Sequence, residues 1–170
     1  NVDELLNVYH QQGIFMQQEK GLVTSAEFRD VIRQMVGKPL TDQQIDDAWN
    51  SFLVDIPTYK LDLLLKLREK YVVYLLSNTN DIHWKWSCEN VFPYRGFQVE
   101  DYFEKIYLSF EMKMVKPDTE IFETVLADAN IDPKETFFID DSEANCLAAQ
   151  ALGISTYTPQ ANEDWSHIFN

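Results

Sequence analysis

The chain has 170 residues, of which 45% are hydrophobic and 25% charged, and its formal net charge at pH 7 is −14. This composition is that of a globular protein long enough to bury a core. The negative charge argues against nucleic acid and anionic membrane surfaces as partners, and the longest apolar run, residues 71–76, is far too short to span a bilayer.

The first part of the chain predicts helices only. Two capping boxes, Thr24-x-x-Glu27 and Thr41-x-x-Gln44, each precede an amphipathic run. Asp3 is a candidate N-cap for a still earlier helix. Because successive helices with no strand between them must bury their apolar faces against one another, we expect them to form a unit of their own.

From Pro57 onward the pattern becomes α/β. Helices are expected after Pro57 and Pro117, and over 81–91 and 144–152; strands are expected at 71–76, 105–109, 136–139 and 154–157. The run 71–76 is apolar throughout, as in a strand buried on both faces. Strands that alternate with helices predict a doubly wound parallel sheet. We therefore expect a helical domain at 1–56 and an α/β domain at 57–170.

Polar side chains follow three of these strands. Ser77 and Asn78 come after the first, Ser109 ends the second, and Asp140 and Asp141 come after the third. Because the carboxyl ends of parallel strands meet at one edge of a sheet, where ligands bind in α/β folds, these residues are candidates for a site.

The adjacent carboxylates Asp140 and Asp141 predict a metal ion. At about 4 Å and an effective dielectric near 20, their repulsion would cost on the order of 4 kcal/mol, which a divalent cation removes. Carboxylate oxygens suit Mg²⁺. The alternative is that one aspartate only caps the following helix, which Ser142 could also do. We favour the metal because a cap needs one aspartate and not two.

Three short motifs follow one another along the chain: Ser77-Asn78, Lys116-Pro117, and Asp140-Asp141 with Asn145. This order resembles motifs II, III and IV of the haloacid dehalogenase (HAD) superfamily of phosphohydrolases, over nearly the whole chain. The helical front segment, with its Glu19-Lys20-Gly21 stretch, is similar to the helical cap of subfamily I. The motif details look most like the branch that holds sugar-phosphate phosphatases and the phosphatase domain of epoxide hydrolases.

The resemblance implies a Rossmann-like core with a small cap, and a role for each motif. Ser77 and Asn78 would donate hydrogen bonds to a phosphoryl oxygen, although a strand-end serine can also simply support a turn. Lys116 would neutralise phosphoryl charge. Its alternatives are a solvated surface lysine, or Lys113 in its place, and the Lys-Pro pair favours Lys116.

The same resemblance makes Asp141 a Mg²⁺ ligand, with Asp140 as a second ligand or as the group that orients a metal-bound water. Asn145 lies four residues after Asp141 on the same helix face. It is either a further Mg²⁺ ligand or a residue that contacts the ligands without binding the metal itself. His83 is a candidate substrate contact, although a histidine beside Trp84 and Trp86 is more often part of the packing. Residues 15–19 are candidates for shaping the substrate pocket, or for packing at a helix end.

One family motif is absent from this sequence. HAD catalysis needs a first strand that ends in Asp-x-Asp, and no such stretch is present. The family places that strand between those ending at Ser77 and at Asp141. We therefore expect the native polypeptide to continue upstream of Asn1 by about 20 residues, the length of one buried strand that ends in aspartate plus a loop into the cap.

These observations favour a Mg²⁺-dependent phosphomonoester hydrolase that works through an aspartyl-phosphate on a small phosphorylated metabolite, with sugar phosphates as the first guess. A haloacid dehalogenase would not need Mg²⁺, so the acidic pair disfavours it. A phosphoryl-receiver domain would have its acidic pair first and its lysine last. A catalytically inactive, scaffold-type relative is the remaining alternative. The separated cysteines, Cys88 and Cys146, favour a reducing compartment, and the cytoplasm is expected.

Overall fold

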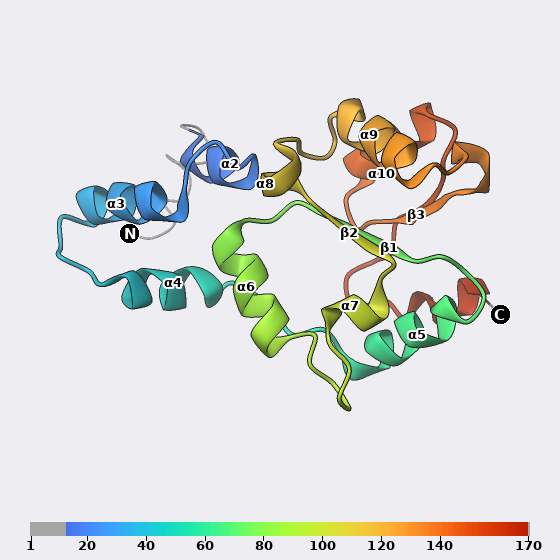
Figure 1. Cartoon of the computed structure of the whole chain (residues 1–170), viewed down its shortest axis with the longest axis horizontal. Coiled ribbons are helices and arrows are strands. Elements are labelled where there is room, and N and C mark those ends of the chain that lie inside the picture. The colour runs from blue at the N-terminus through green and yellow to red at the C-terminus, as the bar shows by residue number, and fades with distance from the viewer. Residues whose placement is uncertain (1–12, 170) are drawn as a thin grey trace. The chain divides into compact units, whose positions relative to one another are not determined.

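The computed structural model describes residues 13–169 of the chain (Figure 1). The chain divides into two compact units, residues 1–113 and 114–170. The helix that we predict after Asp3 lies outside the described residues. The proposed division into a helical domain and an α/β domain at residue 56 stays a prediction.

The helical front segment contains α2 (Ile14–Glu19), α3 (Ser25–Val36) and α4 (Asp42–Asn50). Both predicted capping boxes are confirmed. The Thr24 hydroxyl accepts a hydrogen bond from the backbone N–H of Glu27, and the Glu27 carboxylate accepts one from the Thr24 N–H. Thr41 and Gln44 make the same reciprocal pair at the start of α4. These local bonds satisfy N–H groups that have no partner within the helix.

The apolar faces of these helices share one core cluster with α6 (Asp81–Asn90). Its buried members are Ile14, Phe28, Ile45 and, from α6, Ile82. Phe28 is fully buried. The apolar faces of the helices in the front segment therefore pack against α6, the helix that follows the first strand.

The first strand, β1 (Tyr74–Ser77), begins later than the apolar run predicts. After α5 (Thr58–Arg68), the backbone N–H of Tyr71 still donates to the Leu67 carbonyl at 2.8 Å. Tyr71 and Val72 are 53% and 64% exposed. The prediction of a strand from residue 71 that is buried on both faces is therefore wrong for its first residues, because periodicity alone cannot separate an apolar strand from the end of a helix.

The strands of the first unit form a parallel pair. β1 runs beside β2 (Lys105–Leu108), with Tyr74 opposite Lys105 and Ser77 opposite Leu108 (Figure 1). Two four-residue helices flank β2: α7 (Val99–Tyr102) precedes it and α8 (Ser109–Met112) follows it. Neither was predicted, because a single turn is too short to show helical periodicity.

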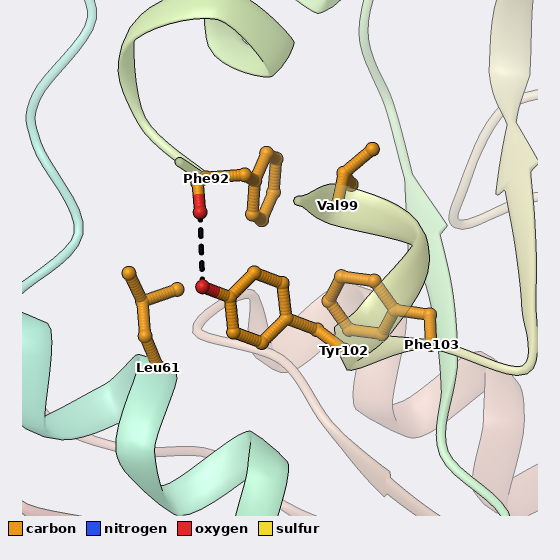
Figure 2. Close-up of a cluster of buried hydrophobic side chains, with 5 residues drawn as sticks. All are labelled: Leu61, Phe92, Val99, Tyr102 and Phe103. Carbon is orange, nitrogen blue, oxygen red and sulfur yellow. Dashed lines mark hydrogen bonds between the residues drawn. The ribbon is translucent and has the colours of Figure 1, made fainter. Parts of the chain in front are cut away.

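A second core cluster supports this strand pair. Its buried members are Leu61, Phe92, Val99, Tyr102 and Phe103 (Figure 2). Tyr102 is fully buried, and its hydroxyl donates a 2.9 Å hydrogen bond to the Phe92 carbonyl. This bond satisfies the one polar atom that the side chain carries into the core.

The second unit also contains a parallel strand pair. Its elements in order are α9 (Thr119–Ala129), the 3₁₀ helix η1 (Pro133–Glu135), β3 (Phe137–Ile139), α10 (Glu143–Ala151), β4 (Ser155–Tyr157) and the 3₁₀ helix η2 (Trp165–Phe169). β3 pairs with β4, with Phe137 opposite Ser155 and Ile139 opposite Tyr157. The helices and strands predicted here are confirmed to within a few residues.

The described strands thus form two pairs, β1–β2 and β3–β4, and both are parallel. Parallel strands joined through helices confirm the predicted α/β class. None of the helices within residues 13–169 is both long and apolar enough to cross a membrane.

Candidate active site

The turn between β3 and α10 carries the acidic pair. The Asp140 N–H donates to the Tyr157 carbonyl at 3.2 Å, so the backbone of Asp140 still belongs to the β3–β4 pair. Two residues later, the Ser142 hydroxyl caps α10 by accepting from the Asn145 N–H. Ser142, and neither aspartate, is therefore the helix cap, which leaves both carboxylates for other roles.

The Asp140 carboxylate is held by three hydrogen-bond donors. Its Oδ1 accepts from the Ser142 N–H at 2.8 Å and from the Asn145 side-chain amide at 3.0 Å. Its Oδ2 accepts from the Lys116 ammonium at 2.6 Å. An anion with this many donors is fixed in one orientation. Asp140 therefore acts in this structure as the group that positions Lys116 and Asn145.

Lys116 reaches Asp140 from the segment before α9. Both side chains of the pair are only 8% exposed. The Lys116 Nζ also lies 5.5 Å from the centre of the Phe138 ring, at the distance of a cation–π contact. A lysine held by a buried carboxylate and an aromatic face is not a solvated surface lysine. The structure therefore excludes that alternative interpretation of Lys116.

Lys113, the sequence rival of Lys116, has a different environment. It ends α8 with a left-handed backbone (φ 59°), and its ammonium donates to the Gly21 carbonyl at 3.0 Å. Lys113 and Gly21 belong to the first unit, whereas Lys116 and Asp140 belong to the second. Of the two lysines, Lys116 is therefore the one paired with the strand-end acid.

Asp141 differs from its neighbour, because its side chain is exposed. No ion pair or side-chain hydrogen bond of Asp141 is found among residues 13–169. From the sequence, the carboxylates of Asp140 and Asp141 are expected to repel each other unless a cation binds between them. The structure shows that Lys116 already offsets the charge of Asp140, so the pair divides into one neutralised and one available carboxylate.

Ser77 and Asn78 lie at the end of β1, and both are half-buried. The next two residues are anchored. The backbone of Thr79 is bonded to the Ser109 hydroxyl, and the Asn80 side chain caps α6 by accepting from the His83 N–H at 3.0 Å. The strand-end placement predicted for Ser77 and Asn78 is confirmed.

His83 packs against the helical front segment. Its ring stacks on Trp49 with the centroids 4.7 Å apart, and its Nε2–H donates to the Trp49 carbonyl at 3.2 Å. Burial lowers the pKa of His83, and the hydrogen bond to Trp49 opposes this in part. The neutral imidazole is therefore the favoured form in the folded protein. Its assignment as a substrate contact stays a prediction.

A cavity of about 460 Å³ lies beside the predicted pocket segment 15–19. Among its lining residues are Gln18, Ser25, Asp81 and Phe110. Gln18 is 3% exposed, and neither polar atom of its amide has a hydrogen-bond partner among the residues that the structure describes. Phe15, in contrast, stacks on Trp49 at 4.8 Å and belongs to the core. Whether residues 15–19 shape a substrate pocket stays a prediction.

The structure thus brings together Lys116, Asp140 and Asn145, with Asp141 next to them in the chain, whereas Ser77, Asn78 and His83 belong to the first unit. Ser109 is one of the strand-end candidates from the sequence, but no specific role follows for it from the sequence. The only signal for it was a polar residue at the end of a strand. That signal does not distinguish a ligand contact from a support for the neighbouring loop.

Comparison with known proteins identifies the family. The model of the haloacid dehalogenase-like hydrolase family matches residues 93–158. The D-ribitol-5-phosphate phosphatase of Bacteroides thetaiotaomicron is 38% identical over 165 residues, which span 97% of this chain and 80% of that protein.

Two crystal structures of a HAD family enzyme from Bacteroides thetaiotaomicron are also similar. One has a TM-score of 0.97 and 74% identity, and the match covers 100% of this chain and 84% of that one. The other is an aspartate-to-alanine variant in complex with magnesium and inorganic phosphate. Its TM-score is 0.92 at 78% identity, over 93% of this chain and 78% of that one. The predicted α/β fold and the predicted superfamily are therefore both confirmed. This chain belongs to the haloacid dehalogenase-like hydrolase family.

Proposed function

We propose that this chain belongs to a Mg²⁺-dependent phosphomonoester hydrolase that acts on a small phosphorylated metabolite. The observation that carries the proposal is the buried Lys116–Asp140 pair beside the exposed carboxylate of Asp141. This arrangement offers a fixed positive charge and an available oxygen ligand at one strand end. Phosphoryl transfer depends on positioned charges of this kind far more than on covalent chemistry by the protein.

The residues at this strand end fit a magnesium ion. No three His, Cys, Asp or Glu side chains within the described residues form a cluster that could hold a metal ion. Mg²⁺ does not need such a cluster, because it binds through one or two carboxylates and keeps waters and phosphate oxygens as its other ligands. We assign Asp141 as the carboxylate ligand, with Asn145 as a second oxygen donor. When bound, the ion would neutralise charge on the phosphoryl oxygens.

Asp140 has a different role in this proposal. Its two oxygens already accept hydrogen bonds from three donors, so it orients Lys116 and Asn145 and does not serve as a principal metal ligand. Lys116 then supplies the positive charge for phosphoryl oxygens. Ser77 and Asn78, held at the end of β1, supply hydrogen-bond donors to a phosphoryl oxygen. The aspartyl-phosphate mechanism, with a nucleophile upstream of residue 1, stays a prediction that residues 13–169 do not test.

For the substrate, we propose a phosphorylated sugar alcohol or sugar. The support is the similarity to the D-ribitol-5-phosphate phosphatase, at 38% identity over 97% of this chain. A class of substrate rather than a single compound is proposed, because pocket residues change faster than a fold does. The net charge of −14 also means that attraction of a phosphate must come from local groups such as Lys116.

The test is hydrolysis of p-nitrophenyl phosphate and of a panel of phosphate monoesters by the full-length protein. The panel should contain ribitol 5-phosphate, pentose phosphates, glycerol phosphates and nucleotides, each with and without Mg²⁺. We expect Mg²⁺-dependent release of phosphate, with the highest kcat/KM for polyol or sugar phosphates. Activity that persists in EDTA would contradict the metal assignment. Release of halide from 2-haloacids without phosphatase activity would indicate a dehalogenase, and no turnover of either kind would indicate a scaffold.

A further inference from the structure

Ser109 makes an unusual pair of contacts with the loop that follows β1. It is the first residue after β2 and lies one position beyond the Ser77–Leu108 pair of the strand ladder. Its hydroxyl accepts a hydrogen bond from the Thr79 N–H at 2.9 Å and donates one to the Thr79 carbonyl at 3.0 Å. The Ser109 side chain is fully buried. One hydroxyl thus satisfies both backbone polar groups of a single residue.

The consequence is that the loop after β1 is anchored at both ends. Ser77 belongs to the strand ladder, Thr79 is held by Ser109, and Asn80 is 2% exposed and caps α6. Asn78 lies between the ladder and the Ser109 contact. A loop held at positions before and after its ligand-binding groups keeps those groups in place before the ligand arrives, which is the requirement for preorganised binding.

Only a hydroxyl can make this contact well. The position needs a small side chain that donates and accepts at the same time, because its partners are an N–H and a C=O of the same residue. Serine and threonine meet this requirement, cysteine does so only weakly, and alanine does not. Loss of the hydroxyl would leave the Thr79 backbone without these partners in a site closed to water on the Ser109 side, so the loop would move to find others.

From this geometry we infer that Ser109 is a positioning residue for the phosphate-binding loop of Ser77 and Asn78. The inference rests on the proposed function, because it assumes that these two residues contact the phosphoryl group. Ser109 itself does not touch the substrate. It holds Thr79, and through Thr79 it fixes the direction in which the preceding donors point.

The experiment compares Ser109→Ala and Ser109→Thr with the wild type in the full-length protein, using p-nitrophenyl phosphate as substrate and inorganic phosphate as inhibitor. For Ser109→Ala we expect kcat/KM to fall by about tenfold or more, since displaced groups lose transition-state contacts. The inhibition constant of phosphate should rise in parallel. Ser109→Thr keeps the hydroxyl and should stay within about threefold of the wild type per folded molecule. Should Ser109→Ala fail to fold, Ser109→Cys takes its place with the same expected loss.

The matched control is Tyr102→Phe, which removes another buried hydroxyl bonded to a backbone carbonyl in the same unit (Figure 2). It should lower the melting temperature but leave kcat/KM and phosphate inhibition unchanged. Equal activity losses in the control and in Ser109→Ala would overturn the inference, as would wild-type kinetics in a folded Ser109→Ala. An inactive wild type would count against the proposed function instead, so the two failures are distinguishable.

Discussion

Gly21 passes so close to Phe110 that a Cβ atom at position 21 would lie 1.9 Å from the Phe110 carbonyl oxygen. Its backbone also has a positive φ of 61°, which side chains other than hydrogen rarely adopt. The loop before α3 and the short helix α8 can therefore approach this closely only if residue 21 is glycine.

This contact predicts a large loss of stability in Gly21→Ala. Overpacking against a backbone oxygen and the left-handed conformation together should lower the free energy of unfolding by about 3 kcal/mol or more. Gly37→Ala is the matched control. Gly37 has a similar φ of 65°, but an added Cβ would meet no atom within 4 Å among the described residues outside its own helix end. It should cost only about 1 kcal/mol. Denaturant titration of both variants measures the difference, and equal losses would show that the close approach is unimportant.

The buried Lys116–Asp140 pair predicts that Lys116 is essential for turnover. Lys116→Ala should lower kcat by at least a hundredfold, which corresponds to about 2.7 kcal/mol of activation free energy. Lys113→Ala should be nearly silent, because the hydrogen bond that the Lys113 ammonium makes within residues 13–169 goes to the Gly21 carbonyl and not to a strand-end carboxylate. Lys116→Met, which keeps most of the side-chain length without the charge, separates charge from packing. The opposite ranking of the two lysines would mean that the phosphate-binding lysine has been misplaced.

The two neighbouring aspartates should respond differently to mutation. Asp141→Ala should abolish the response of activity to Mg²⁺ while changing the free energy of unfolding by less than about 0.5 kcal/mol, because the side chain is exposed. Asp140→Asn should destabilise the fold by on the order of 3 kcal/mol, because it breaks a buried ion pair. Calorimetric titration with Mg²⁺ and urea unfolding measure the two effects. An Asp141→Ala variant that still binds Mg²⁺ would remove that residue from the metal site.

His83 predicts a pH dependence of stability. Burial lowers its pKa in the folded state, so below the unfolded pKa of about 6.5 the unfolded chain binds more protons than the folded one. The stability that depends on neutral His83 is therefore present above about pH 6.5. It is lost as the pH falls from there through the lower folded pKa. Urea unfolding between pH 8 and pH 5 should show a shallower decline in His83→Gln than in the wild type. Parallel curves would show that His83 makes no such contribution.

Several features of this protein follow from the sequence alone because their causes are local. The capping boxes at Thr24 and Thr41 begin α3 and α4 where predicted, since an N-cap and its partner are three residues apart and need no tertiary contact. The apolar run 137–139 followed by Asp140 and Asp141 likewise marks a strand end. The order of the three motifs was sufficient for the family, which the comparisons confirm.

Other features were decided only by the tertiary structure. The apolar run at 71–76 begins in the turn that follows α5, because the β1–β2 register and not composition sets where the strand starts. The two adjacent aspartates look alike in sequence, yet Lys116, 24 residues upstream of Asp140, neutralises one and leaves the other exposed. Ser109 contacts Thr79 across 30 residues of chain. Such pairings depend on which strand lies beside which, and residue patterns along a single segment carry no information about a partner that far away.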